Sequence, residues 1–345
     1  MSKIGSRVSL LLALILSFAA IVPSSAQTKP KTPFTFILDF VPFAEYTPFY
    51  TALAKGWYAE EGLDVKILRG AGSGDTVKRI AAGQGNAGMG DLSALVSAQA
   101  NDAIPVRAVL AYFRRPPHCW YVRGDSAIKT AKDLENHTLA TTTGNSNRVL
   151  FPYFAQRAGI DPDKIKWVTM DGASLFPAML LGRVDAVSSF AMHEPRLAKQ
   201  AAERNLTIRR FSYAESGVDI YSLVLFARDD EIKNNGEALK AFLRATVRAM
   251  KYAWAKENIA EGAKALIDAT PEINTAADLD VATATATISA QYGLTDEITS
   301  GKVAVGQFEP DRTELSRDIF TKYLSLKRTV PINEIYSNDL IPEKK

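Results

Sequence analysis

Residues 34–65 constrain the fold of this chain more than any other stretch. Their first six side chains alternate in a β-prone run, which predicts a buried strand. Thr47 is expected to cap a helix, because apolar residues recur after it at helical spacing, and Gly62 is expected to end that helix. A second strand is expected over 63–68. The order of strand, helix and strand predicts a βαβ unit with parallel strands.

The loop after the first strand is the first candidate ligand site, because ligands bind beyond the carboxyl ends of parallel strands. It holds the rings of Phe40, Phe43 and Tyr46 and the carboxylate of Glu45. Each ring alone is equally consistent with core packing. Their grouping beside a carboxylate favours a site for a small molecule.

The start of the chain has the pattern of a secretory signal peptide. Lys3 and Arg7 precede an apolar run over 8–22, and small residues follow as far as Ala26. We expect cleavage near Ala26, with residues 1–26 removed. The cleavage site lacks the cysteine that a bacterial lipid anchor would need. No later stretch approaches the roughly 20 apolar residues of a membrane span. The periplasm is therefore the expected location.

Composition limits the remaining classes. About 319 residues would follow the cleavage site, which favours two domains, and removal of Lys3 and Arg7 lowers the formal charge from +3 to +1. A near-neutral chain gives no electrostatic case for nucleic acid. The single cysteine, Cys119, excludes an internal disulfide and is expected to be a buried thiol on a strand. The three histidines lack ligand-like spacing, so neither a metal nor a cofactor is expected.

Two further loops in the first half carry candidate residues. Ser73 and Gly74 lie in a glycine-rich turn over 69–75 whose spacing matches neither a Walker loop nor a dinucleotide fingerprint, and a plain tight turn explains it equally well. Asp91 follows a short strand and opens a helix, a position that capping alone explains. All three are candidate ligand contacts because they are expected at strand ends.

The second half repeats the pattern of strand, polar loop and helix. The loop over 143–148 is expected to present N–H groups and side-chain donors at the start of a helix over 149–158, an arrangement suited to a carboxylate, phosphate, sulfonate or ring carbonyl. Carboxylates follow two later strands, where a favourable helix N-terminal charge is the alternative explanation. The candidates of this half are Gly144, Asn145, Ser146, Asn147, Asp171 and Glu194.

Two chain crossings are expected between the domains. The rigid segment 114–117 (RRPP) marks the first crossing, and the loop between strands expected over 207–213 and 221–227 marks the return. The prediction is a discontinuous lobe I made of 27–116 and 216–345, which includes the C-terminal helices, and a lobe II made of 117–215.

Four motifs resemble a known family. They are LDF..F....PFY.A...GWY..EGLDV over 38–65, GSGD over 72–75, GQGNAGMGD over 83–91 and KDLENHTLA over 132–140. They are similar to the periplasmic solute-binding proteins of ABC importers, and within them to the branch shared by thiamine-pyrimidine precursor binders and the related pyrimidine synthase. The resemblance covers about residues 34–228.

This resemblance implies an α/β protein of the type II periplasmic binding protein fold, with two lobes joined by two crossover segments around a ligand cleft. The implied function is capture of a small aromatic or heterocyclic solute, such as a thiamine pyrimidine precursor, by a non-enzymatic monomer that delivers it to an ABC permease in the inner membrane. The alternatives are a sulfonate, taurine or nitrate binder, an enzyme like the pyrimidine synthase, and a receptor for a sensor protein.

The resemblance also implies roles for individual residues. Phe40 would lie against the ligand ring, Glu45 and Tyr46 would make polar or aromatic contacts, residues 144–147 would donate hydrogen bonds, and Glu194 would face the amidine edge of the ring. This chain has Phe40 where related proteins carry tryptophan and Tyr46 where they often carry histidine. The acidic residues in the candidate loops favour a ligand with amine, amidine or amide groups.

Overall fold

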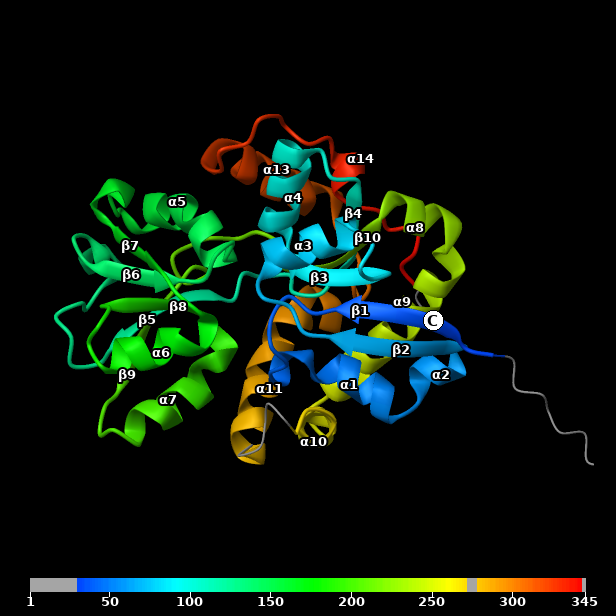
Figure 1. Cartoon of the computed structure of the whole chain (residues 1–345), viewed down its shortest axis with the longest axis horizontal. Helices are drawn as coiled ribbons and strands as arrows, with labels where there is room; N and C mark the ends of the chain where they lie inside the picture. The colour runs from blue at the N-terminus through cyan, green and yellow to red at the C-terminus, as the bar shows by residue number, and fades with distance from the viewer. Residues whose placement is uncertain (1–29, 272–277, 343–345) are drawn as a thin grey trace, which may run out of the picture. The chain divides into compact units, whose positions relative to one another are not determined.

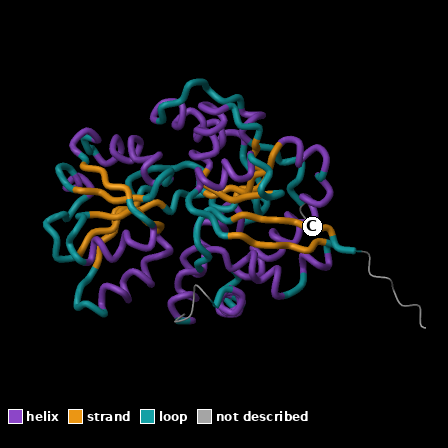
Figure 2. Tube along the Cα trace, in the orientation of Figure 1, coloured by secondary structure: helices purple, strands orange, loops and turns teal. Residues whose placement is uncertain are grey.

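The computed structural model describes residues 30–271 and 278–342, so the predicted signal peptide and its cleavage site near Ala26 lie outside the described residues. The described residues form two five-stranded mixed sheets flanked by helices (Figures 1 and 2). Within the same ranges, none of the helices has the length and apolar character needed to cross a bilayer. The strands are β1 (Thr32–Ile37), β2 (Leu63–Leu68), β3 (Ala87–Asp91), β4 (Val106–Ala111), β5 (His118–Arg123), β6 (Thr138–Thr141), β7 (Lys166–Thr169), β8 (Ala186–Phe190), β9 (Ile208–Ser212) and β10 (Leu223–Arg228).

The first sheet has the order β2-β1-β3-β10-β4 and the second has the order β7-β6-β8-β5-β9. β1 pairs in parallel with β2 and β3, which confirms the predicted βαβ unit, whereas β10 runs antiparallel to β3 and β4. The chain therefore enters the second sheet between β4 and β5 and returns between β9 and β10. The lobe boundaries proposed at 116/117 and 215/216 lie in these two connections, and their exact positions remain predictions.

The helix expected from Thr47 to Gly62 is divided in two. α1 (Thr47–Ala54) and α2 (Trp57–Glu60) are separated at Gly56, whose φ of 71° lies in the left-handed region that glycine adopts readily. Thr47 is the first residue of α1 rather than its cap, because a 3₁₀ turn over Ala44–Tyr46 leads directly into the helix. The other helices are α3 (Ser73–Ala81), α4 (Leu92–Asp102), α5 (Ser146–Ala158), α6 (Gly172–Leu180), α7 (Glu194–Ala202), α8 (Asp229–Asn234), α9 (Gly236–Ala253), α10 (Ile259–Ala269), α11 (Leu279–Gly293), α12 (Asp296–Thr299), α13 (Pro310–Tyr323) and α14 (Ile332–Ile335).

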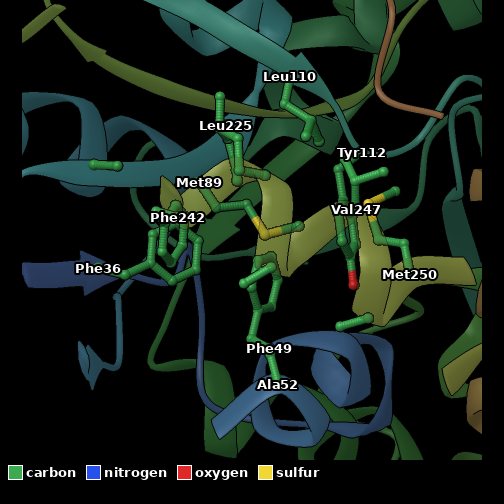
Figure 3. Packing of buried hydrophobic residues seen from close by; sticks show 14 of the residues in the cluster. Phe36, Phe49, Ala52, Met89, Leu110, Tyr112, Leu225, Phe242, Val247 and Met250 are labelled. Atoms are coloured by element: carbon green, nitrogen blue, oxygen red, sulfur yellow. The ribbon is translucent and has the colours of Figure 1, made fainter. Parts of the chain in front are cut away.

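Aromatic packing beneath the first sheet fixes β1 against α9. The ring of Phe242 on α9 stacks on Phe34 of β1, with centroids 4.6 Å apart, and on Tyr58 of α2 at 5.1 Å. Figure 3 shows Phe242 beside Phe36 and Met89 in this core. Because β1 ends at the candidate ligand loop, this packing fixes the position of that loop.

The second sheet is covered on both faces, as alternation along β5 shows. Trp120 and Val122 belong to the cluster that contains the α5 side chains Phe151 and Phe154, whereas Cys119 on the opposite face packs with α6. Figure 1 shows α5 on one side of this sheet and α6 and α7 on the other. Cys119 is buried on a strand, as predicted from the sequence.

Candidate functional site

A cavity of about 830 Å³ lies where loops from the carboxyl ends of strands in both sheets meet. Its walls come from five segments, 39–46, 69–73, 142–147, 169–177 and 187–200. This volume is in the range that a small organic ligand occupies in a protein. The strand ends of both lobes therefore face one shared cavity. For the loop after β1, this is the position that the βαβ order predicts.

The glycine-rich turn is held directly against the end of β1. The N–H of Gly72 donates to the carbonyl of Asp39 at 2.7 Å, and the N–H of Gly70 donates to that of Phe40 at 3.2 Å. A Cβ at Gly70 would lie 2.2 Å from the carbonyl oxygen of Leu38. Only glycine fits there, so this glycine serves the close approach of two backbone segments that form one wall of the cavity.

Glu45 and His193 join the two lobes at the cavity. His193 Nε2 lies 2.9 Å from Glu45 Oε1, and His193 Nδ1 lies 2.9 Å from the hydroxyl of Ser189. Because a carboxylate only accepts, Nε2–H donates to Glu45, and in the neutral imidazole Nδ1 accepts from Ser189. Glu45 is 1% exposed, and its second oxygen, Oε2, has no hydrogen-bond partner among the described residues.

Asp39 is a second buried carboxyl group in the wall. It accepts from the hydroxyl of Tyr46 at 2.8 Å and from that of Ser73 at 3.4 Å. Burial raises the pKa of Asp39 to about 7, with the charge of Glu45 acting in the same direction and the bond from Tyr46 opposing it. Burial also raises the pKa of Tyr46 well above its usual value, so its hydroxyl stays a donor.

The polar loop after β6 contributes the start of α5. Asn145 caps this helix by accepting from the N–H of Asn147 at 2.9 Å, so Ser146 and Asn147 lie in its first turn. The helix thus begins earlier than the expected residue 149, because the cap is Asn145 itself. Asn147 is 1% exposed, and its Oδ1 has no hydrogen-bond partner among the described residues.

The cavity brings together most of the residues predicted from the sequence. Each of the following lines it: Phe40, Glu45, Tyr46, Ser73, Asn145, Ser146, Asn147 and Asp171. Asp171 also caps α6 by accepting from the N–H of Ala173 at 2.8 Å. Their contact with a ligand remains a prediction.

Four predicted residues are absent from the cavity wall as described: Gly74, Asp91, Gly144 and Glu194. Gly74 and Gly144 come from opposite lobes, and a Cβ added at Gly74 would lie 3.5 Å from the carbonyl oxygen of Gly144. These two glycines therefore approach each other beside the cavity, while neighbouring residues of both loops line it.

Asp91 is held by residues near both sheets, including the first residue of β5 in the second sheet. It caps α4 by accepting from the N–H of Ser93 at 2.9 Å, and its other oxygen accepts from Ser222 at 2.8 Å and lies 3.4 Å from Nε2 of His118. Burial lowers the pKa of His118. Since Asp91 is fully buried in these contacts, its position supports a structural role.

Glu194 also has a protein partner outside the cavity. Its carboxylate accepts from Arg210 at 2.6 Å, and Arg210 pairs in addition with Glu215 at 2.9 Å. The expectation that Glu194 faces a ligand ring does not fit this position. As the first residue of α7 it instead provides the favourable N-terminal charge that was the alternative explanation.

The wall residues that were not predicted as ligand contacts include Asp39, His193 and Arg196. Asp39 lies two residues after the end of β1 and immediately before the candidate loop, which was a usable signal. His193 and Arg196 are three residues apart at the start of α7 and so share one side of it. Within 30–271 and 278–342, no group of three or more His, Cys, Asp or Glu side chains is arranged to hold a metal ion.

Comparison with known proteins places this geometry in context. A family model described as NMT1/THI5 like matches residues 44–260. The formylaminopyrimidine-binding protein of Halalkalibacterium halodurans is 26% identical over 77% of this chain and 79% of that protein. The riboflavin-binding protein RibY of Chloroflexus aurantiacus is 24% identical over 67% of this chain and 65% of its own length, slightly less than two thirds.

A 4-amino-5-hydroxymethyl-2-methylpyrimidine phosphate synthase of Saccharomyces cerevisiae is 25% identical over 70% of this chain and 72% of that enzyme. Among solved structures, a protein from Bordetella bronchiseptica has a TM-score of 0.70 at 20% identity, covering 90% of this chain and 96% of that one. The periplasmic aliphatic sulphonate binding protein SsuA from Escherichia coli has a TM-score of 0.67 at 15% identity, covering 91% and 94%. These structures confirm the predicted fold of periplasmic binding proteins.

Proposed function

The chain belongs to the NMT1/THI5-like family, and on that basis we propose that it is the solute-binding component of an ABC importer. Its ligand is a small nitrogen heterocycle that carries N–H donors, in the chemical class of the aminopyrimidines. The predicted signal peptide supports a periplasmic location, and the cognate permease in the inner membrane is the partner that receives the solute. The protein acts as a monomer and without catalysis.

One observation carries this proposal: the cavity wall holds two buried acceptors that lack a donor. Glu45 Oε2 and Asn147 Oδ1 have no hydrogen-bond partner among the described residues, although both side chains are 1% exposed. A buried acceptor left unpaired costs about 1–3 kcal/mol. A ligand with N–H groups on its edges would satisfy both acceptors, so ligand binding would recover this energy.

The apolar part of the wall suits a flat ring. Phe40 and Phe43 both line the cavity, with ring centroids 6.4 Å apart. Aromatic faces of this kind stabilise a heterocycle by stacking, typically by about 0.5–1.5 kcal/mol beyond the area buried. The names of two relatives, a formylaminopyrimidine binder and a riboflavin binder, point to the same class of ligand.

A sulfonate or nitrate binder is the second candidate, and the fold shared with the sulphonate binder SsuA favours it. Two buried carboxyl groups, Asp39 and Glu45, face the cavity. A simple anion brings no donor for Glu45 Oε2 or Asn147 Oδ1 and adds a negative charge near Glu45. The donor-bearing heterocycle fits this wall better.

An enzyme like the pyrimidine synthases is the third candidate, because that name occurs among the relatives. At the position where the family resemblance leads us to expect histidine, this chain has Tyr46. Its hydroxyl is buried and donates to Asp39 at 2.8 Å. A tyrosine fixed in this way supports ring packing and cavity shape rather than a reactive role.

A thermal-shift screen of the mature protein tests the proposal, because a ligand that binds only the folded state raises the melting temperature. The panel contains aminopyrimidines, flavins, nucleobases, aliphatic sulfonates, nitrate and aliphatic amines, and each positive compound is then titrated by calorimetry. We expect the largest shift with an aminopyrimidine or another N–H-bearing heterocycle. A shift only with sulfonates or nitrate would overturn the ligand class, and turnover of a bound pyrimidine would overturn the non-catalytic assignment.

A further inference from the structure

Arg196 is a cation in the cavity wall that the proposed function has not used. It lies on α7 of the second lobe, three residues after His193, and lines the cavity. Its guanidinium carbon lies 4.5 Å above the ring centroid of Phe43, which belongs to the first lobe. The positive charge of Arg196 therefore lies where the two lobes meet, in the wall of the cavity.

Arg196 has neither a salt bridge nor a hydrogen bond among the described residues, and its guanidinium stacks on the aromatic face of Phe43. This contrasts with Arg210 in the same lobe, which pairs with two carboxylates. The guanidinium has five N–H donors and no acceptor, so stacking on Phe43 leaves its donors unused.

The surroundings of Arg196 make an unpaired charge unfavourable. Burial lowers the pKa of Arg196, and the negative charge of Glu45 partly offsets that effect. Glu45 itself is engaged by His193 through Oε1 and is not within salt-bridge distance of Arg196. The wall thus holds a partly desolvated cation without an anion and, through Glu45 Oε2 and Asn147 Oδ1, acceptors without donors.

We infer that the ligand of this cavity is bifunctional, with N–H donors directed at Glu45 and Asn147 and an anionic group, a carboxylate in the simplest case, directed at Arg196. This inference rests on the proposed function and narrows its ligand class to acidic nitrogen heterocycles. A carboxylate accepts two parallel hydrogen bonds from a guanidinium, and this geometry is specific to arginine. The ring stacked near Phe43 would then lie between the two polar ends.

The test compares matched ligand pairs by calorimetry near neutral pH. 4-Amino-2-methylpyrimidine-5-carboxylic acid and its carboxamide share the ring and the amine and differ in charge, and corresponding acid and amide pairs of pyridine and pteridine extend the series. We expect at least one acid to bind about tenfold more tightly than its amide, the gain of a charge-assisted pair. Arg196→Gln should reduce that ratio to about one, and Arg196→Lys should restore only part of it.

Arg148 provides a matched control. It is another arginine of the second lobe stacked on an aromatic ring, with its guanidinium carbon 3.3 Å from the Trp167 centroid, and it lines a different cavity. Arg148→Gln should keep the full preference for the acid. Loss of the preference in both variants would indicate a general effect of removing a cation and would overturn the inference.

The remaining outcomes separate this inference from the proposed function. If uncharged heterocycles bind as tightly as their acids and Arg196→Gln changes neither, the inference is wrong and the proposed function stands. If only anions without N–H donors bind, both the inference and the proposed ligand class are wrong. If no member of the series binds while the protein is folded by circular dichroism, both are likewise wrong.

Discussion

His193 Nε2 lies 2.9 Å from Glu45 Oε1, and this hydrogen bond joins the two lobes at the wall of the cavity. The two residues are 148 positions apart in the chain. Because the bond uses Oε1, the orientation of the carboxylate is fixed, and Oε2 has no hydrogen-bond partner among the described residues. Glu45 is therefore both an interlobe contact and the acceptor that we assign to the ligand.

Replacing Glu45 with glutamine is expected to weaken ligand binding by about tenfold or more. The substitution removes a charged acceptor from a buried site, where a charge-assisted hydrogen bond is worth about 1.5–3 kcal/mol. Calorimetric titration with the best compound of the screen measures the change. Glu194→Gln is the matched control: the family resemblance implied that Glu194 faces the ligand, but its pairing with Arg210 outside the cavity now predicts an affinity within about twofold of the original. Equal losses in both variants would contradict this assignment.

Gly172→Ala is expected to weaken binding at least about fivefold, the equivalent of about 1 kcal/mol of overpacking. A Cβ at Gly172 in the second lobe would lie 2.6 Å from Cζ of the Phe40 ring in the first. The Phe40 ring must then move, either into the cavity or away from the second lobe. Gly236→Ala is the control, because a Cβ there meets nothing within 4 Å. Unchanged affinity in Gly172→Ala would show that Phe40 moves freely and does not shape the site.

Local patterns in the sequence predicted the elements well where the deciding interactions are local. Gly62, as the expected end of the helix, placed the second strand at 63–68, the range that β2 occupies. The division of the helix before this strand depends on Lys55 and Gly56, and the apolar stripe that continues across them obscured it. This local break changed the detail of the unit and left the order of strand, helix and strand intact.

The composition of the site was only partly predictable, because its contacts connect distant residues. Asp91 looked like Asp171 in sequence, since each follows a strand and caps a helix. The structure separates them: Ser222, 131 positions away, and His118 enclose Asp91, whereas Asp171 lines the cavity. Arg196 follows Glu194 by two residues, yet only Arg196 lines the cavity. No local pattern distinguishes these cases.

Phe242→Ala is expected to lower the free energy of unfolding by about 3–5 kcal/mol. The ring is fully buried and contacts Phe34, Phe36 and Tyr58 around the first sheet. Urea denaturation followed by circular dichroism measures the change. Leu53→Ala, at a side chain that is 40% exposed, should cost less than about 1 kcal/mol. A loss below that value in Phe242→Ala would contradict the assigned core.

Asp39→Asn is expected to change how stability depends on pH. The pKa of Asp39 is raised by burial from 3.8 to about 7 in the folded protein. Between these values the folded protein keeps a proton that the unfolded chain has released, so the contribution of Asp39 to the free energy of unfolding falls as pH rises from about 4 to about 7. The contribution is constant outside this window. Its total fall can reach about 4 kcal/mol, at about 1.4 kcal/mol for each unit of pKa change.

Asparagine removes this titration while its amide oxygen still accepts from the hydroxyl of Tyr46, which lies 2.8 Å from the carboxyl oxygen in the original protein. Urea denaturation at closely spaced pH values should therefore show the stability of the original protein falling relative to that of Asp39→Asn between about pH 4 and pH 7. Asp64→Asn, at an exposed position on β2, is the control and should follow the original protein across the range. Parallel curves for the original protein and Asp39→Asn would mean that Asp39 is ionised throughout this pH range. The cavity would then carry a second full negative charge and would favour a ligand with a cationic group.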